Sequence, residues 1–321
     1  MKLFIVFFMM VQFICFLALV ALLIAYICFS KVFKTSKRLT LGKGEYDLPP
    51  DDIYKPYYPQ MRKWVDEIRS MDRELLEIKS FDGLTLRGYY YEYSPDSPIE
   101  LLFHGYGGNA ERDLSGGVER CFALGRSAIL IDQRGAGMSD GNVCSFGINE
   151  RFDCIDWIYY VTSKFGSDRP LIIGGISMGA STVMMAAGEG LPKNVVCVMA
   201  DCGYSCQKEI ICKVLEEMKL PVDIVYPFIK LGASLYGKFD LEEITPIDAV
   251  AKSKTPMIFI HGDNDAFVPH SMSLDCYAVC KAPKKMVTIE GAGHGLAFPA
   301  DRKKYIESLR DFEKEANIFN K

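Results

Sequence analysis

The chain has 321 residues, of which 49% are hydrophobic and 24% charged, and its formal net charge is −4. A chain of this length can form one large domain with a full hydrophobic core and an additional segment. Because no basic stripe with interleaved aromatic residues is present, the composition excludes the usual signature of a nucleic-acid partner.

The first segment, residues 1–30, is predicted to be a transmembrane anchor. Residues 3–29 carry no charge and are almost wholly apolar, and this run is longer than the ~20 residues that span a bilayer core. The alternative is a cleaved signal peptide, whose apolar region is about half as long and ends at a small-residue cleavage site. Here bulky residues lead directly to Ser30 and Lys31, which favours a retained single-pass anchor.

The flanking charges predict the orientation of this anchor. Lys2 precedes the apolar run, and four basic residues follow it: Lys31, Lys34, Lys37 and Arg38. The positive-inside rule then places the C-terminal body in the cytoplasm. The cysteines agree with this prediction, because two of the 11 lie in the anchor and the odd number that is left cannot pair completely.

Residues 31–73 are interpreted as a neck followed by an amphipathic helix. Prolines and clustered tyrosines come first, and Met61, Trp64, Ile68 and Met71 then follow at helical spacing. We expect this helix to pack on the body rather than on the membrane.

The body, residues 74–321, alternates short apolar runs with helical patterns. An Asp82-Gly83 turn between two strand patterns, residues 74–80 and 84–93, predicts a β-hairpin. Short continuous apolar runs are typical of strands that are buried on both faces of a parallel sheet. Such runs lie at residues 99–103, 128–131, 171–173, 195–199, 257–260 and 286–289. Helical patterns lie at residues 111–125, 148–165, 177–188, 270–280 and 302–316. The alternation predicts a doubly wound α/β sheet.

Residues 203–243 break this alternation. The segment has helical patterning, with an apolar face that includes Ile210, Val214 and Met218. We interpret it as a helical cap over the C-terminal edge of the sheet, because insertions of this length in compact domains are commonly lids or binding elements. The alternative is a pair of ordinary surface helices.

A candidate nucleophile lies where a buried strand pattern turns into a helix pattern. Gly175-Ile-Ser177-Met-Gly179 has the G-x-S-x-G spacing of a nucleophile elbow, a strained turn that holds a serine hydroxyl clear of the fold. The same spacing recurs around Ser139, but there it has no strand before it and no helix after it. We therefore predict Ser177 as the nucleophile and a loop position for Ser139.

A nucleophilic serine needs a general base and a carboxylate that orients the base. Of the four histidines, His294 lies in a glycine-rich loop after the last strand, where the backbone is free to bring the imidazole over the sheet. We predict His294 as the base. His104 and His261 end strands, and we expect both to have structural hydrogen-bonding roles.

The predicted acid is Asp265, in the loop after the strand at residues 257–260. Asp263 in the same loop is expected to close its own turn through the backbone. Asp201, which follows the preceding strand, is the second candidate for the acid. The predicted oxyanion hole consists of two backbone N–H groups, those of Met178 and Tyr106.

From residue 75 onward, about three-quarters of the chain resembles a serine hydrolase of the α/β-hydrolase superfamily. The resemblance rests on motifs at residues 104–108, 132–141, 175–179, 261–269 and 293–295, which are specific in this combination and order. It is strongest to a group that includes serine aminopeptidases, monoacylglycerol-lipase-like and cinnamoyl-esterase-like proteins, with single-pass bacterial members. The chain departs from lipases with a longer His-Gly-Gly-Gly run. The resemblance implies a mostly parallel eight-stranded sheet with helices on both faces and a small cap, and a structural role for the loop at residues 132–141.

The sequence thus predicts a serine hydrolase that cleaves carboxylic esters or thioesters through an acyl-enzyme, without a cofactor or metal. The anchor and the apolar insertion favour a lipid-like acyl substrate, and small soluble esters remain compatible. The alternatives are an aminopeptidase-type peptidase and a membrane-tethered scaffold without catalytic activity.

Overall fold

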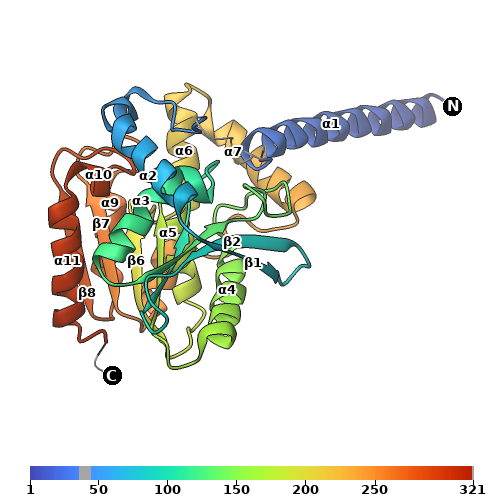
Figure 1. Ribbon diagram of the computed structural model, residues 1–321. Coiled ribbons are helices and arrows are strands. Elements are labelled where there is room, and N and C mark those ends of the chain that lie inside the picture. The colour runs from blue at the N-terminus through green and yellow to red at the C-terminus, as the bar shows by residue number, and fades with distance from the viewer. Residues whose placement is uncertain (36–44, 320–321) are drawn as a thin grey trace.

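The computed structural model describes residues 1–35 and 45–319 (Figure 1). Lys37 and Arg38, two of the basic residues that follow the apolar run, lie outside the described residues.

An eight-stranded sheet forms the centre of the body, with the strand order β1-β2-β4-β3-β5-β6-β7-β8. The strands are β1 (Glu74–Lys79), β2 (Thr85–Tyr91), β3 (Ile99–Phe103), β4 (Ser127–Asp132), β5 (Leu171–Ile176), β6 (Val195–Asp201), β7 (Met257–Gly262) and β8 (Lys284–Ile289). β2 pairs antiparallel with β1 and β4, and all other pairs are parallel. The predicted mostly parallel α/β sheet is therefore confirmed, and the predicted hairpin forms its antiparallel edge.

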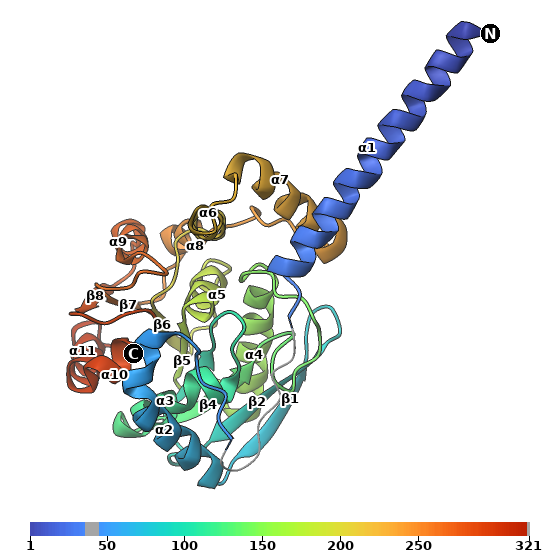
Figure 2. The same ribbon diagram turned by 90° about the horizontal axis from the view of Figure 1, so that it is seen from above.

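Helices cover both faces of this sheet (Figures 1 and 2). One face carries α2 (Tyr58–Ser70), α3 (Ala110–Ala123) and α11 (Arg302–Glu315), and the other carries α4 (Glu150–Phe165), α5 (Met178–Ala187), α8 (Pro246–Lys252) and α9 (His270–Val279). The short helix α10 (Ala297–Ala300) precedes α11. Successive residues of a strand point to opposite faces, so Leu101 and Phe103 join one core cluster and Leu102 the other. Burial on both faces explains why the strands are continuous apolar runs.

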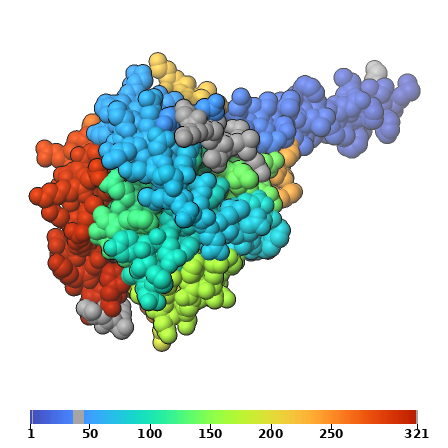
Figure 3. All heavy atoms as spheres, viewed as in Figure 1, coloured from blue at the N-terminus to red at the C-terminus, as the bar shows by residue number. Residues whose placement is uncertain are grey.

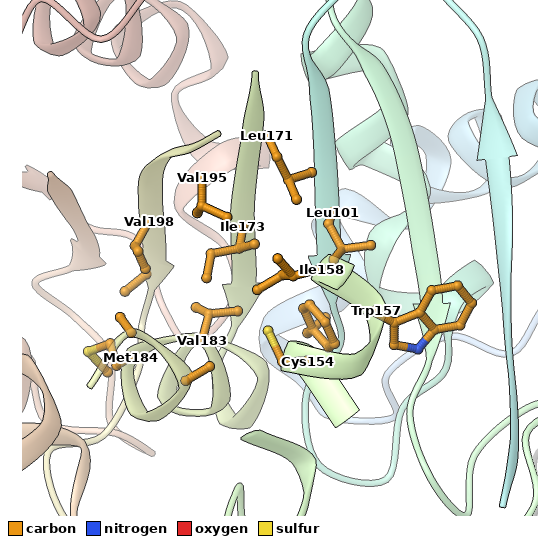
Figure 4. Close-up of a cluster of buried hydrophobic side chains, with 14 of the residues drawn as sticks. Leu101, Cys154, Trp157, Ile158, Leu171, Ile173, Val183, Met184, Val195 and Val198 are labelled. Carbon is orange, nitrogen blue, oxygen red and sulfur yellow. The ribbon is translucent and has the colours of Figure 1, made fainter. Parts of the chain in front are cut away.

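Figure 4 shows the core on the face covered by α4 and α5. Trp157 and Ile158 of α4 and Val183 of α5 are inaccessible to solvent and pack with Ile173 of β5. Burial of apolar surface contributes about 25 cal/mol per Å² and is the main favourable contribution to folding. Because α5 and β5 both belong to this packed layer, the connection between them is held in place.

Helix α2 packs on the opposite face, as the sequence pattern predicted. Trp64 is buried, stacks on Phe298 with ring centroids 5.5 Å apart, and lies against α3. A Cβ atom added at Gly116 of α3 would lie 2.8 Å from the Trp64 ring, so this close approach needs a glycine. The 3-10 helix η1 (Asp52–Tyr57) is the last part of the neck and lies directly before α2.

Helix α1 (Lys2–Val32) is apolar and long enough to cross a membrane, with a mean hydropathy of 2.9, and a signal sequence would meet the same criteria. Its first part projects from the body as a rod (Figures 2 and 3). Its last turns belong to the body instead, because Ala25, Phe29 and the following Phe33 are buried.

The segment between β6 and α8 is helical, as predicted. It contains α6 (Gln207–Glu217), α7 (Val222–Gly232) and a π-helical turn, η2 (Ala233–Gly237). Ile211 of α6 and Ile229 of α7 share a core cluster with Phe29 and Phe33. The end of α1 and the predicted cap are therefore packed together.

Candidate active site

The sharp turn between β5 and α5 presents Ser177. Its backbone has φ 56° and ψ −118°, a conformation that side-chain-bearing residues rarely adopt and that is associated with functional sites. The flanking glycines are required by space: a Cβ atom would lie 2.2 Å from the Gly179 backbone if added at Gly175, and 2.1 Å from the Phe103 carbonyl oxygen if added at Gly179. The strained turn is therefore held by close packing of β3, β5 and α5.

The structure brings together the three side chains that the sequence predicted as nucleophile, base and acid. His294 Nε2 lies 2.8 Å from Ser177 Oγ, and His294 Nδ1 lies 2.7 Å from Asp265 Oδ2. An ionised carboxylate can only accept a hydrogen bond, so Nδ1 carries the proton and Nε2 is left to accept from the serine hydroxyl. This tautomer is the one that allows His294 to take the hydroxyl proton of Ser177.

Asp265 accepts four hydrogen bonds. Its Oδ1 accepts from the backbone N–H groups of Phe267 and Val268, both at 2.9 Å. Its Oδ2 contacts His261 Nε2 at 3.1 Å in addition to His294. Burial acts to raise the pKa of Asp265, but the hydrogen bonds from His261 and His294 outweigh it and hold this pKa below its ordinary value. Asp265 is therefore an ionised, fixed partner for His294.

His261 has the structural hydrogen-bonding role expected of it, and its partner is the Asp265 carboxylate. Its Nε2 contacts two acceptors, Asp265 Oδ2 and the Val268 carbonyl, so this nitrogen carries the proton. Its Nδ1 then accepts a hydrogen bond from Ser273 Oγ at 2.7 Å. The sequence signal for this pairing is a histidine that ends a strand four residues before Asp265, but the spacing alone does not show which acceptor the ring contacts.

The alternative acids have other partners. Asp201 Oδ2 accepts a hydrogen bond from the Tyr305 hydroxyl at 2.8 Å, and burial raises the pKa of Asp201. The expected turn-closing role of Asp263 is wrong, because its carboxylate accepts from the Gly291 N–H at 2.7 Å. This contact ties the loop after β7 to the loop that carries His294.

Ser139 and His104 are structural. Ser139 is completely buried in the loop after β4, where its hydroxyl donates to the Asp132 carbonyl and accepts from the Arg87 N–H. His104 Nε2 accepts from the Gln133 N–H at 3.1 Å, and burial lowers the pKa of His104. Neither side chain is in a position to react with a substrate.

The predicted oxyanion donors lie in two segments that converge on Ser177. Met178 is the first residue of α5, and the first amides of a helix have no partner within the helix. Tyr106 lies in the loop after β3, which Asp113 of α3 fixes by accepting from the Gly105 N–H at 3.1 Å. Gly107 in the same loop has φ +63°, a backbone conformation that favours glycine over residues with a side chain.

Two cavities meet at Ser177. One, of about 860 Å³, is bounded by charged and polar side chains as well as apolar ones, including Arg112, Asp113 and Glu217. The other, of about 710 Å³, has mostly apolar walls. Both volumes are within the ~300–1,000 Å³ that is typical of ligand pockets. The two spaces that meet at Ser177 therefore differ in the polarity of their walls.

The neck contributes to the site, a role that was not part of its interpretation from the sequence. Pro49 and Tyr54, together with other residues of the segment around η1, line the more polar cavity. The sequence held no local signal for this, because the contact depends on how the chain returns over the sheet.

Among the described residues, one group has a geometry that could hold a metal ion: potential ligand atoms of Cys202, Asp265 and His294 lie within 4.8 Å of one another. Asp265 and His294 are already hydrogen-bonded to each other, and burial raises the pKa of the Cys202 thiol well above its ordinary value. A cysteine binds a metal ion as the thiolate, so a raised thiol pKa and the existing hydrogen bond favour the hydrogen-bonded triad over metal coordination.

The eight-stranded sheet, the elbow at Ser177 and the adjacent His294 define the class of protein: a serine hydrolase with the α/β-hydrolase fold. Residues 145–317, more than half of the chain, match the prolyl oligopeptidase family, and the chain belongs to that family.

Among its relatives, protein YqkD of Bacillus subtilis is 25% identical over 92% of this chain and 95% of its own length. Protein bem46 of Schizosaccharomyces pombe is also 25% identical, over 78% of this chain and 79% of its own length.

Solved structures show the same fold. An esterase of Pyrococcus furiosus superposes with a TM-score of 0.64 and 19% identity, covering 88% of this chain and 98% of its own. Est1E of Butyrivibrio proteoclasticus, solved with ferulic acid bound, has a TM-score of 0.58 and 19% identity, covering 77% of this chain and 100% of its own.

Proposed function

We propose that the protein hydrolyses carboxylic esters or thioesters, with Ser177 as nucleophile, His294 as general base and Asp265 as the acid that orients it. The observation that supports this proposal is the continuous row of hydrogen bonds from Asp265 Oδ2 through the His294 ring to Ser177 Oγ, at 2.7 Å and 2.8 Å. Both distances are within the range needed for direct proton transfer.

The reaction proceeds in two halves. Ser177 Oγ forms a bond to the carbonyl carbon while its proton passes to His294 Nε2, and the carbonyl oxygen becomes an oxyanion. The N–H groups of Met178 and Tyr106 stabilise this oxyanion, each by about 3 kcal/mol. His294 then returns the proton to the departing alcohol or thiol. In the second half, His294 takes a proton from water, and the resulting nucleophile releases the acid from the acyl-enzyme.

Labelling with a fluorophosphonate tests the proposal. The unsubstituted full-length protein forms one covalent adduct at Ser177 and hydrolyses p-nitrophenyl acetate, whereas Ser177→Ala loses both activities. Ser139→Ala is the matched control, because Ser139 lies in the second G-x-S-x-G match and is buried. We expect the Ser139→Ala variant to form the adduct as the unsubstituted protein does. An unlabelled Ser177 in folded protein would favour the scaffold function instead.

A peptidase is the second candidate, because the family to which the chain belongs is named for an oligopeptidase. An aminopeptidase has to hold the positively charged amine of its substrate. Two carboxylates that line the polar cavity already have cationic partners: Asp113 accepts from Arg112 at 2.7 Å, and Glu217 pairs with Lys213. We therefore expect aminoacyl p-nitroanilides to be cleaved far more slowly than esters. Faster anilide cleavage would assign the peptidase function.

A further inference from the structure

The apolar cavity beside Ser177 has a wall that comes from helix α1. Ile27, Cys28, Lys31 and Val32, in its last turns, line this cavity together with side chains of α6 and α7. Ile27 belongs to the uncharged run, whereas Lys31 is the first charged residue after it. If α1 crosses a bilayer, this wall lies at the boundary between hydrocarbon and water, where lysine side chains extend to the interface.

Contacts along α1 hold the wall in place. The Tyr106 hydroxyl donates to the Val32 carbonyl at 2.7 Å, and the Tyr236 hydroxyl of η2 donates to the Leu22 carbonyl at 3.0 Å. Gly232 of α7 approaches α1 so closely that an added Cβ atom would lie 2.5 Å from the Ala25 carbonyl oxygen. The end of α1 is therefore a fixed part of the body.

The surface beside this wall is also apolar. Met218 at the end of α6 and Ile224 of α7 are each 62% exposed, and Leu231 of α7 is partly exposed. Both views of the ribbon place α7 beside the end of α1 (Figures 1 and 2). A helical surface of this kind is typical of segments that lie in the headgroup region of a membrane.

We infer that the substrate is a membrane lipid with a long acyl chain in ester linkage, and that this chain passes from the bilayer into the apolar cavity along α1. Helix α1 then serves as the membrane anchor and as one wall of the acyl-binding site. The inference rests on the proposed ester hydrolysis, because Ser177 lines both cavities. The more polar cavity, with Arg112 and Glu217, receives the alcohol part of the lipid.

The test uses the full-length protein in phosphatidylcholine vesicles. The substrates are p-nitrophenyl esters from acetyl to dodecanoyl, and monooleoylglycerol incorporated into the same vesicles. We expect kcat/KM to rise by about two- to fourfold for each added methylene until the cavity is filled, because each methylene loses its contact with water. We also expect the monooleoylglycerol to be hydrolysed.

Two variants narrow the cavity from different helices. Ile27→Trp acts from α1, and Val214→Trp acts from α6. In both, the ratio of kcat/KM for the octanoyl ester to that for the acetyl ester falls by about tenfold or more. Leu23→Trp is the matched control, because it adds the same bulk one turn earlier on α1, at a residue that does not line the cavity. We expect Leu23→Trp to leave the octanoyl-to-acetyl ratio of kcat/KM unchanged.

Three results would overturn the inference: acetyl-ester hydrolysis with no rise in kcat/KM with chain length, variants that behave like Leu23→Trp, or vesicle monooleoylglycerol that stays intact. Fluorophosphonate labelling of Ser177 identifies the variants that are folded. If Ile27→Trp is not labelled, Val214→Trp and the chain-length series still test whether the apolar cavity binds the acyl chain. Failure of the unsubstituted protein to cleave any ester or to be labelled would instead overturn the proposed function.

Discussion

Asp265 accepts hydrogen bonds from two backbone amides and two histidines. Its negative charge therefore lies next to His294 Nδ1, where it stabilises the proton on that nitrogen. We predict that Asp265→Asn lowers kcat for p-nitrophenyl acetate by about 10³–10⁴-fold. An amide nitrogen in place of Oδ2 would face the two histidine N–H groups and favour the other His294 tautomer, which cannot accept the Ser177 proton. Steady-state kinetics, with a thermal unfolding control, provide the measurement.

The comparison for this variant is Asp201→Asn, which removes the charge of the second candidate acid. We expect its kcat to stay within a few-fold of the unsubstituted value, because the amide oxygen can still accept from Tyr305. A larger loss of activity in Asp201→Asn than in Asp265→Asn would show that the acid is assigned wrongly.

Asp201 also leads to a prediction about stability and pH. Burial raises its pKa in the folded protein, whereas an aspartate in an unfolded chain has a pKa of about 3.9. Between these two values the folded state keeps a proton that the unfolded state has released, so the stability contributed by this group falls as pH rises through that window. Asparagine does not titrate, so Asp201→Asn removes this pH-dependent loss of stability.

Thermal midpoints of Asp201→Asn and the unsubstituted protein, measured in the same detergent from pH 4 to pH 8, test this. The variant should become the relatively more stable of the two as pH rises, and each kcal/mol of difference shifts the midpoint by about 2–4 °C. A difference that is constant with pH, or that changes in the opposite direction, would contradict the assignment of a raised pKa to Asp201.

The pairing of α1 with α7 depends on a small residue at their contact. A Cβ atom at Gly232 would lie 2.5 Å from the Ala25 carbonyl oxygen and 3.0 Å from Phe29 Cβ. Because backbone atoms cannot move aside as easily as a flexible side chain, Gly232→Ala should push the helices apart and cost about 1–3 kcal/mol. Thermal unfolding and limited proteolysis between α1 and the body are the measurements.

Gly83→Ala controls for the effect of adding a methyl group to a glycine. Gly83 has φ +89° and open space around its Cα atom, so alanine there meets backbone strain but no clash, at a cost of about 1 kcal/mol. It should leave the proteolysis of α1 unchanged. Equal sensitivity of both variants to proteolysis would show that α1 and α7 are not closely packed.

The arrangement of the whole chain in a membrane is open to direct measurement. We predict that the mature protein retains residues 1–30 and that the body faces the cytoplasm. In an Asp168→Cys variant, which places a thiol in an exposed turn after α4, a membrane-impermeant maleimide should label inverted vesicles and not intact cells. Labelling of intact cells would place the body outside, and a mass lacking the first segment would identify a signal peptide.

Much of the body could be predicted because its signals are local. Runs such as Ile99–Phe103 are apolar at every position since both faces of the sheet are covered, and the strand pattern before Ser177 changes to a helix pattern within the elbow itself. The order of Ser177, Asp265 and His294 along the chain also followed from their positions after strands. Their catalytic roles stay predictions, although the three side chains lie within hydrogen-bonding distance.

By itself, the sequence determined the class of fold, the elbow and the apolar first helix, because each is written in residues that are neighbours along the chain. Only the tertiary structure decided that His261 supports Asp265, that Asp263 bonds to Gly291, and that the end of α1 lines a cavity at Ser177. These contacts join segments that are distant in sequence or depend on side-chain direction. Such contacts are set by the packing of the complete chain, and no local periodicity records them.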